Sequence, residues 1–272
     1  MIQTEKPMLN GTINVDAELI NDFRQQGHVL IKNILQADEV AHYRDVINKA
    51  VNRYNTETRA MQDRDTYGKA FLQIMNLWEV DDNVKEFTLA KRFAKIAADL
   101  LGVDHVRIYH DQALFKEAGG GFTPWHQDQY YWPLDTNKTV TMWMPLMDID
   151  VELGMLTFAS GSHLDGFAEN IPISDESETS LQKHIREKNY PITRAETMQA
   201  GDATWHYGWT LHNAPGNSSA DTTREVMTII YYADGAHVTE PQNKHQENDR
   251  HRWLGGLNPG DAAQSHLNPL AY

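Results

Sequence analysis

The sequence contains no cysteine among its 272 residues. This absence excludes disulfide bonds, iron–sulfur clusters, thiolate nucleophiles and thiolate-bound zinc. Any metal ion must therefore be held by nitrogen and oxygen ligands, and the 13 histidines of the chain are numerous enough to contribute some of them.

Long apolar segments are also absent. No stretch reaches the roughly 18 consecutive apolar residues that indicate a membrane-spanning helix. The first residues, Met1–Asn10, lack the positive and apolar layout of a secretory signal, and the terminal Leu270-Ala271-Tyr272 is not a peroxisomal address. We therefore expect a cytoplasmic protein that has no membrane partner.

Basic residues are outnumbered, because 24 Lys and Arg stand against 38 Asp and Glu and the net charge is −14. A surface that follows nucleic-acid phosphates needs clustered positive charge, so we expect no nucleic-acid partner. The same acidity disfavours large polyanionic substrates such as coenzyme A thioesters. A small-molecule substrate is the partner that we expect, and the sequence leaves the oligomeric state open.

The N-terminal part, about residues 16–102, is predicted to be helical. Apolar residues recur at helical spacing in three segments, 16–26, 38–54 and 82–101. Gly27 and Gly102 are suited to end the first and the third of these helices. An apolar stretch over residues 28–35 separates the first two and is predicted to form a strand.

From Val106 onward the pattern changes to short β-rich runs separated by turn residues. We predict strands at residues 106–109, 112–116, 125–132, 140–146, 155–159, 203–207 and 224–232. Helices followed by many short strands favour a mainly β fold with flanking α-helices, a double-stranded β-helix (jelly roll, cupin-like) or a related sandwich. We expect one domain over residues 1–272, with its β core at about 106–232.

The segment 164–199 is polar and contains the acidic residues Asp175, Glu176 and Glu178. Its length indicates an insertion between strands, and long insertions often form lids or binding loops. We predict that it partly covers the mouth of a pocket and is more mobile than the β core. A solvated surface excursion is the alternative.

The tripeptide His126-Gln127-Asp128 has the spacing of a metal site within a predicted strand. Side chains two apart on a strand point to the same face, so an imidazole and a carboxylate can reach one ion. A distant second histidine would complete the facial triad of non-haem iron(II) oxygenases. His163-Leu164-Asp165 has the same spacing, but it follows Gly161-Ser162 in a predicted turn, where the two side chains need not share a face.

Arg224 follows His212 by twelve residues and opens a predicted strand. A planar guanidinium matches a carboxylate in two parallel hydrogen bonds. A dicarboxylate that chelates a metal at one end needs such a partner at its other end. Two further histidines, His110 and His206, are more typical of packed core or surface positions than of catalysis.

These residues resemble the phytanoyl-CoA dioxygenase family, which also contains bacterial ectoine hydroxylases. The resemblance extends from Gly27-His28-Val29 to about Tyr232. The motifs that carry it are Thr123-Pro124-Trp125-His126-Gln127-Asp128, Gly154-Met155-Leu156, Gly161-Ser162-His163, Gly201-Asp202, His212 and Arg224. The fold of this family is a double-stranded β-helix.

The resemblance implies iron(II) as the metal, with 2-oxoglutarate and dioxygen (O2) as co-substrates. The implied iron ligands are His126, Asp128 and His212. Arg224 would bind the far carboxylate of 2-oxoglutarate. An approximate alignment adds Gln73, Gln112 and Trp143 as co-substrate contacts, although buried Gln and Trp side chains often serve packing alone.

The implied reaction is hydroxylation of a C–H bond of a small polar molecule, with release of succinate and carbon dioxide. In related halogenases a small residue replaces the carboxylate ligand, so Asp128 argues for hydroxylation. Desaturation, epimerisation and ring closure are further possibilities. A metal-binding, cupin-like binding protein without oxygenase activity is the alternative from another class, because a fold alone does not define a function.

Strand parity extends the prediction to the substrate. If residues 125–132 form one regular strand, Tyr130 and Trp132 face the metal together with His126 and Asp128, and Tyr131 points outward. Ectoine hydroxylases have an aromatic residue at the position of Trp132. We therefore predict that Tyr130 and Trp132 form part of the substrate wall, and that the substrate is a compact polar molecule, with a cation as one possibility. The alternative is that both aromatic residues only fill the interior of the barrel.

Overall fold

A computed structural model describes residues 6–272 of the chain. Its N-terminal part is largely helical. The helices are α1 (Ala17–Gln26), α2 (Ala37–Tyr54), α3 (Thr66–Ala70), α4 (Leu77–Val80), α5 (Asp82–Thr88) and α6 (Lys91–Leu101), with a 3-10 helix, η1 (Met61–Asp63), between α2 and α3. Helix α1 ends at Gly27, whose φ of 83° is a conformation that glycine adopts without steric cost.

The largest sheet has six antiparallel strands in the order β1-β10-β5-β12-β3-β2. Its strands are β1 (His28–Ile31), β2 (Leu72–Met75), β3 (Val106–Phe115), β5 (Thr139–Pro145), β10 (Ala203–Tyr207) and β12 (Val226–Ala233). Strand β3 is continuous where two strands were predicted. Strands β5 and β12 are buried along their whole length, because both faces of the sheet are covered.

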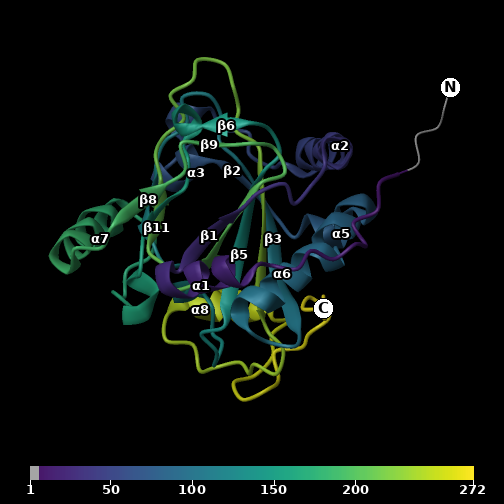
Figure 1. Cartoon of the computed structure of the whole chain (residues 1–272). Helices are drawn as coiled ribbons and strands as arrows, with labels where there is room; N and C mark the ends of the chain where they lie inside the picture. Colours follow the sequence, from purple (N-terminus) through teal and green to yellow (C-terminus); the bar gives the residue numbers. More distant parts are fainter. Residues whose placement is uncertain (1–5) are drawn as a thin grey trace.

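A second antiparallel sheet has the order β4-β11-β7-β8, and β6 pairs with β9. These strands are β4 (Thr123–His126), β6 (Ile149–Asp150), β7 (Thr157–Ala159), β8 (Ile192–Arg194), β9 (Thr197–Met198) and β11 (His212–Ala214). Antiparallel sheets with helices outside them form the jelly-roll arrangement shown in Figure 1. The prediction of a mainly β fold with flanking helices is confirmed.

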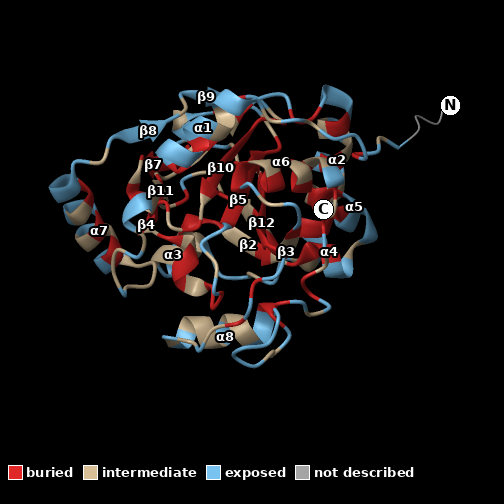
Figure 2. Cartoon of the chain, turned by 60° about the horizontal axis from the view of Figure 1, so that its bottom comes forward, coloured by how far each residue is buried: buried red, intermediate tan, exposed pale blue. Residues whose placement is uncertain are grey.

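The main hydrophobic core lies between the six-stranded sheet and the N-terminal helices. Helix α6 crosses this sheet over β3, β5 and β12 and buries Phe93, Ile96 and Leu100 against it. Figure 2 shows the central strands as buried and the outward sides of the helices as exposed. Most of the core thus lies on the helical side of the sheet.

The predicted helix over residues 82–101 is two helices, α5 and α6. Ala90 interrupts them with an extended backbone, at φ −61° and ψ 122°. The hydroxyl of Thr88 donates a 2.8 Å hydrogen bond to the buried carboxylate of Asp111 on β3, which fixes the end of α5. The apolar spacing therefore predicted the buried faces correctly but not the break between the helices.

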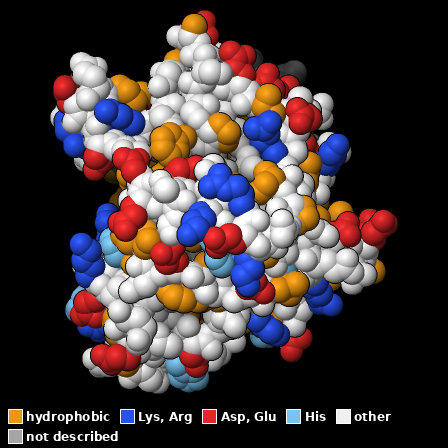
Figure 3. Space-filling view, turned by 90° about the vertical axis from the view of Figure 1, so that its left-hand side faces the viewer, with side chains coloured by type: hydrophobic (Ala, Val, Ile, Leu, Met, Phe, Trp, Pro, Cys, Tyr) orange, Lys and Arg blue, Asp and Glu red, His pale blue; other side chains and the backbone are white. Residues whose placement is uncertain are grey.

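The polar segment 164–199 contains a helix, α7 (Asp175–Lys188), as well as β8 and β9. Helix α7 packs on β4, where Trp125 N–H donates to Glu178 at 2.9 Å and the Ser177 hydroxyl donates to Trp125 O at 3.0 Å. On this side of the molecule, acidic, basic and hydrophobic side chains are interspersed over the surface (Figure 3). Part of the predicted insertion is therefore regular structure that supports a strand of the β core.

Two elements near the site were not predicted. Residues Asp128–Tyr131 form a 3-10 helix, η2, and Lys244–Trp253 form helix α8 near the C-terminus. Two further 3-10 helices are η3 (Val151–Leu153) and η4 (Ser162–Asp165). Within residues 6–272, none of the helices combines the length and the apolar content that crossing a bilayer requires.

Candidate active site

The two histidines of the predicted triad lie on adjacent strands. His126 is the last residue of β4 and His212 the first residue of β11, and the two are directly opposite each other in the antiparallel pair. Their ring centroids are 4.1 Å apart. Residues 86 positions apart in sequence are thus brought together by one strand pairing.

Asp128 completes the group from η2, directly after β4. Its Oδ1 lies 3.5 Å from His126 Nε2 and 3.6 Å from His212 Nε2. One ligand atom from each of the three residues lies within 4.8 Å of the others. Two imidazole nitrogens and one carboxylate oxygen are the donor set of a facial triad, so the three residues fit an iron(II) ion.

Backbone carbonyls orient both imidazoles. His126 Nδ1 donates to Pro124 O at 2.7 Å, and His212 Nδ1 donates to Thr210 O at 2.9 Å. Each Nε2 therefore keeps a lone pair that faces the centre of the site. Such hydrogen bonds from the other ring nitrogen are typical of metal-ligating histidines.

The second oxygen of Asp128 is held from the six-stranded sheet. The Thr141 hydroxyl donates to Asp128 Oδ2 at 2.8 Å, and His206 Nε2 lies 3.2 Å from the same atom. Thr141 and His206 are cross-strand partners on β5 and β10. Asp128 thus points one oxygen at the imidazoles and has the other fixed, as a monodentate ligand requires.

The protonation states also suit a metal. Burial alone would raise the pKa of Asp128, but its interactions with His212, His126 and His206 outweigh burial and lower that pKa well below its usual value. Burial, together with the neighbouring histidines, lowers the pKa of His212 well below its usual value. An ionised carboxylate and a neutral imidazole are the forms that bind metal ions.

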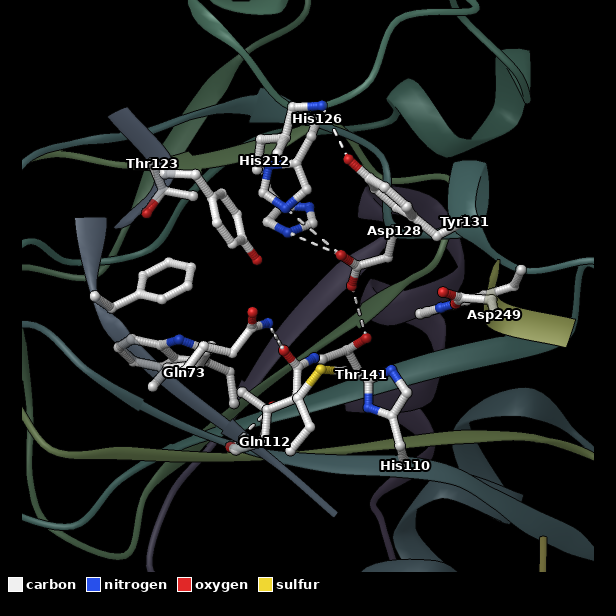
Figure 4. Close-up of a pocket in the computed structure, with 18 of the residues that line it drawn as sticks. Gln73, His110, Gln112, Thr123, His126, Asp128, Tyr131, Thr141, His212 and Asp249 are labelled. Atoms are coloured by element: carbon white, nitrogen blue, oxygen red, sulfur yellow. Dashed lines mark hydrogen bonds and ion pairs between the residues drawn. The ribbon is translucent and has the colours of Figure 1, made fainter. Parts of the chain in front are cut away.

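The triad opens into a cavity of about 440 Å³, which Figure 4 shows in part. Arg224 lines this cavity, 1% exposed, just before β12. Its Nη1 donates to Gly154 O, its Nε has no hydrogen-bond partner, and no carboxylate among the described residues pairs with it. Burial lowers the pKa of Arg224 to about 9. A buried guanidinium without a counter-ion is expected of a receptor for a carboxylate.

The other predicted co-substrate contacts line the same cavity. Trp143 stacks against Arg224, with the guanidinium carbon 5.2 Å from the ring centroid. Gln73 on β2 donates from its Nε2 to Gln112 Oε1 on β3. Arg224, Trp143, Gln73 and Gln112 thus all line the same cavity, and Figure 4 shows Gln73 and Gln112 directed toward it. Their roles in binding 2-oxoglutarate remain predictions.

The strand-parity prediction is wrong at Tyr131. Because β4 ends at His126 and a 3-10 helix follows, the alternation of side chains stops there. Tyr131 lines the cavity and accepts a 2.9 Å hydrogen bond from Ile173 N–H, whereas Tyr130 is not among the lining residues. Trp132 does line the cavity, but as the residue after a helical turn.

His110 and His206 are buried, as expected of core histidines, and both also line the cavity. His163 is not part of it and binds Arg24 O at 3.0 Å from its turn. Ile173, within the predicted insertion, contributes to the lining.

Helix α8 brings residues to the cavity that the sequence did not indicate. The lining residues from α8 are His245, Asn248, Asp249, Arg252 and Trp253. Their spacing of three, four and seven positions defines one helical face, which is a detectable signal. It was not recognised because this face is polar and charged instead of apolar.

A facial triad that shares a jelly-roll cavity with an unpaired, buried arginine defines the site of a non-haem iron oxygenase. Residues 23–226 match the model of the family described as phytanoyl-CoA dioxygenase (PhyH). This match covers most of the chain, and the chain belongs to the phytanoyl-CoA dioxygenase family. The resemblance predicted from sequence is confirmed.

Individual relatives agree with this assignment. A probable alpha-ketoglutarate-dependent hypophosphite dioxygenase of Stutzerimonas stutzeri is 22% identical over 226 residues, which cover 80% of this chain and 78% of the relative. The solved alpha-ketoglutarate-dependent carbocyclase SnoK from nogalamycin biosynthesis is 25% identical, with a TM-score of 0.76 over 96% of this chain and 99% of SnoK. The epimerase SnoN, solved with Fe3+, alpha-ketoglutarate and nogalamycin RO, is 23% identical, with a TM-score of 0.78 over 94% of this chain and 98% of SnoN.

The chain is therefore a 2-oxoglutarate-dependent dioxygenase. Its cofactors are iron and 2-oxoglutarate, with dioxygen as the co-substrate, and the cluster of His126, Asp128 and His212 fits the iron.

Proposed function

We propose that this enzyme hydroxylates a C–H bond of a small polar molecule, with release of succinate and carbon dioxide. One observation carries the proposal: the His-Asp-His cluster shares its cavity with Arg224, which has no carboxylate partner among residues 6–272. An intact Asp128 supports hydroxylation over halogenation, because its carboxylate occupies the place that a halide ligand would need.

Iron(II) held by the triad would supply dioxygen activation coupled to decarboxylation of 2-oxoglutarate. His126 and His212 would offer neutral nitrogen donors, and Thr141 would keep one Asp128 oxygen turned toward the metal. Arg224 would bind the far carboxylate in a bidentate pair. The Trp143 ring covers the guanidinium and would shield that pair from water, which strengthens it.

Anaerobic titration with iron(II) and 2-oxoglutarate tests the proposal. We expect a visible metal-to-ligand absorption band in the wild type and none in His126→Ala or His212→Ala. Arg224→Ala should bind 2-oxoglutarate more weakly, with a loss of about 2–5 kcal/mol of binding free energy, as is typical when one partner of a buried charge pair is removed. Arg224→Lys should restore only part of the affinity for 2-oxoglutarate, since a point charge cannot reproduce the planar fork of a guanidinium. The exposed Arg53→Ala is the matched control.

Two results would contradict this reading. Unchanged 2-oxoglutarate affinity in Arg224→Ala would mean that another cation holds the carboxylate. Formation of the band without any succinate after admission of air would favour the alternative, a metal-binding jelly-roll protein without oxygenase activity.

Ring closure and epimerisation are the other reactions to distinguish, because they are named for SnoK and SnoN. The mass of the product separates them once a substrate is identified. Hydroxylation adds one oxygen atom, ring closure removes two hydrogen atoms, and epimerisation leaves the mass unchanged.

A further inference from the structure

Helix α8 closes the part of the cavity that lies away from the 2-oxoglutarate contacts. In Figure 4, Asp249 lies on the opposite side of Asp128 from Gln73 and Thr123. Trp253 is the only buried residue of α8, so the helix is not placed there by a large apolar face. It instead turns charged and polar side chains toward a cavity.

Specific contacts hold α8 in place. Gln246 Nε2 donates to Tyr130 O at 3.1 Å near the start of the helix. Asn268, wholly buried, donates from Nδ2 to Trp253 O at 3.0 Å near its end. Between them, the hydroxyl of the buried Tyr109 donates to Asp249 Oδ2 at 3.0 Å. The Asp249 carboxylate thus has a fixed position on the cavity wall.

The Asp249 carboxylate has no salt bridge to the protein. No cation among the described residues lies within ion-pairing distance of it, although the charge of Arg252 acts on it from farther away. Glu247 on the same helix differs, since it pairs with Arg250 at 2.8 Å and His251 at 2.9 Å outside the cavity. Burial raises the pKa of Asp249 to about 7, and Tyr109 and Arg252 only partly oppose this. A cation bound beside this buried carboxylate would stabilise its ionised form.

Aromatic residues share the cavity wall with this carboxylate. Trp132 and Trp253 line the same cavity and are 5% and 6% exposed. Tyr109, which binds Asp249, lies 5.4 Å from Trp132 between ring centroids, and His110 lies 5.2 Å from Trp253. A carboxylate and indole rings in one cavity can bind an ammonium group together, through charge and cation–π attraction.

We propose that Asp249, with Trp132 and Trp253, forms a subsite for a protonated or quaternary ammonium group of the substrate. The proposal rests on the proposed function and assigns the substrate to the class of small amines. The ammonium group would bind on the α8 side of the metal, so the C–H bond that reacts would lie between this group and the iron. Arg252 also lines the cavity, and its guanidinium carbon lies 4.5 Å from the ring centroid of Trp253, so the ammonium group would use the part of that indole that Arg252 leaves open.

The test uses iron- and 2-oxoglutarate-loaded protein without oxygen, titrated by calorimetry with three cationic probes and their neutral isosteres. The probes are choline, tetramethylammonium and n-butylammonium. Their neutral counterparts are 3,3-dimethylbutanol, neopentyl alcohol and n-pentanol, in the same order. We expect at least one cation to bind about tenfold or more tightly than its isostere, as a charge-assisted contact would provide. Asp249→Asn should remove that preference and can still accept the hydrogen bond from Tyr109.

Glu247→Gln is the matched control, because it removes one negative charge from the same helix outside the cavity and should leave the preference intact. Equal binding of cations and isosteres, no binding of any cation, or an undiminished preference in Asp249→Asn would each overturn the subsite. The absorption band of the loaded protein tests the proposed function separately. If the wild type forms the band but binds no cation, the proposed function stands and only the subsite is overturned.

Discussion

At the scale of single residues, the carboxylate ligand depends on one hydroxyl from the neighbouring sheet. Thr141→Val keeps the shape of the side chain but removes the 2.8 Å hydrogen bond to Asp128. We expect iron(II) affinity to fall by about 10- to 100-fold, as is typical when a partner of a metal ligand is lost. Competition with a metal chelator measures this.

Thr204→Val provides the control for that experiment. Thr204 is equally buried, on the adjacent strand β10, but its hydroxyl has no hydrogen-bond partner. Its replacement should leave iron affinity unchanged. If both variants lost iron to the same degree, general loosening of the sheet would explain the effect and the hydroxyl of Thr141 would have no special role.

A second residue, Lys116, makes stability depend on pH. Burial and, to a lesser degree, the charge of Arg224 lower the pKa of Lys116 from 10.5 to about 6. The folded chain therefore binds fewer protons than the unfolded chain between these values, and this contribution to stability rises with pH across that window. Its stabilising effect is largest above pH 10.5 and is lost as pH falls toward 6.

Lys116→Met should remove this dependence. We expect its free energy of unfolding to change less between pH 7 and 9 than that of the wild type, as measured by denaturant titration without 2-oxoglutarate. That window begins at the raised pKa of about 7 that burial gives Asp111 and Asp249, and these two carboxyls are present in both proteins. The exposed Lys91→Met should retain the wild-type slope, and an unchanged slope in Lys116→Met would show that Lys116 stays charged when folded.

At the scale of elements, the segment between η4 and α7 is attached to the site by two side chains. Gln127 bridges to Gly166 O at 2.7 Å and Ala168 N at 2.9 Å, and Tyr131 accepts from Ile173 N–H at 2.9 Å. Ile173 lines the cavity, whereas α7 behind it is bound to β4. The predicted lid would thus be this short connection, with α7 as its fixed support.

Tyr131→Phe should loosen that connection. Loss of one hydrogen bond of about 0.5–1.5 kcal/mol should speed amide hydrogen exchange there by about two- to twelve-fold, whereas exchange in α7 should not change. Mass spectrometry of peptides covering residues 169–174 and 178–187 measures both. Tyr130→Phe alters a neighbouring hydroxyl outside the cavity lining and should have no effect. Faster exchange in both peptides would mean that the whole segment moves as one unit.

The same elements show what sequence patterns can predict. Strand β10 was predicted at its observed bounds, 203–207, since apolar and aromatic residues mark a strand buried on both faces. The 3-10 turn after His126 was not, because an aromatic run continues through it and resembles a strand. Helix α8 was missed since its only buried residue is Trp253, so no apolar periodicity marks it.

Some residues of the site could also be predicted from the sequence, whereas others could not. His126, Asp128, His212 and Arg224 were found from residue type, spacing and family resemblance. The Thr141 and His206 contacts to Asp128 depend on how β5 and β10 pair across the fold, which no local pattern specifies. Asp249 reaches the cavity only because α8 returns to it from the end of the chain.

At the scale of the whole molecule, the main core and the site are separate. The largest hydrophobic cluster lies between the six-stranded sheet and the N-terminal helices, and none of the hydrophobic residues that line the cavity belongs to it. Removal of iron therefore leaves that core intact, and we expect the metal-free protein to stay folded. Ligands should then add stability only by binding the native state.

Thermal unfolding tests this separation. A ligand at about 100 times its dissociation constant stabilises by about 2.7 kcal/mol, and about 1 kcal/mol shifts the Tm of a domain of this size by about 2–4 °C. Iron(II) and 2-oxoglutarate should each raise Tm in the wild type under anaerobic conditions. In Arg224→Ala the shift from iron should persist and that from 2-oxoglutarate should largely vanish, whereas His212→Ala should lose both, because 2-oxoglutarate chelates the metal. Melting followed by circular dichroism measures each shift. Unfolding of the wild type when a chelator removes iron would show that the metal is part of the fold.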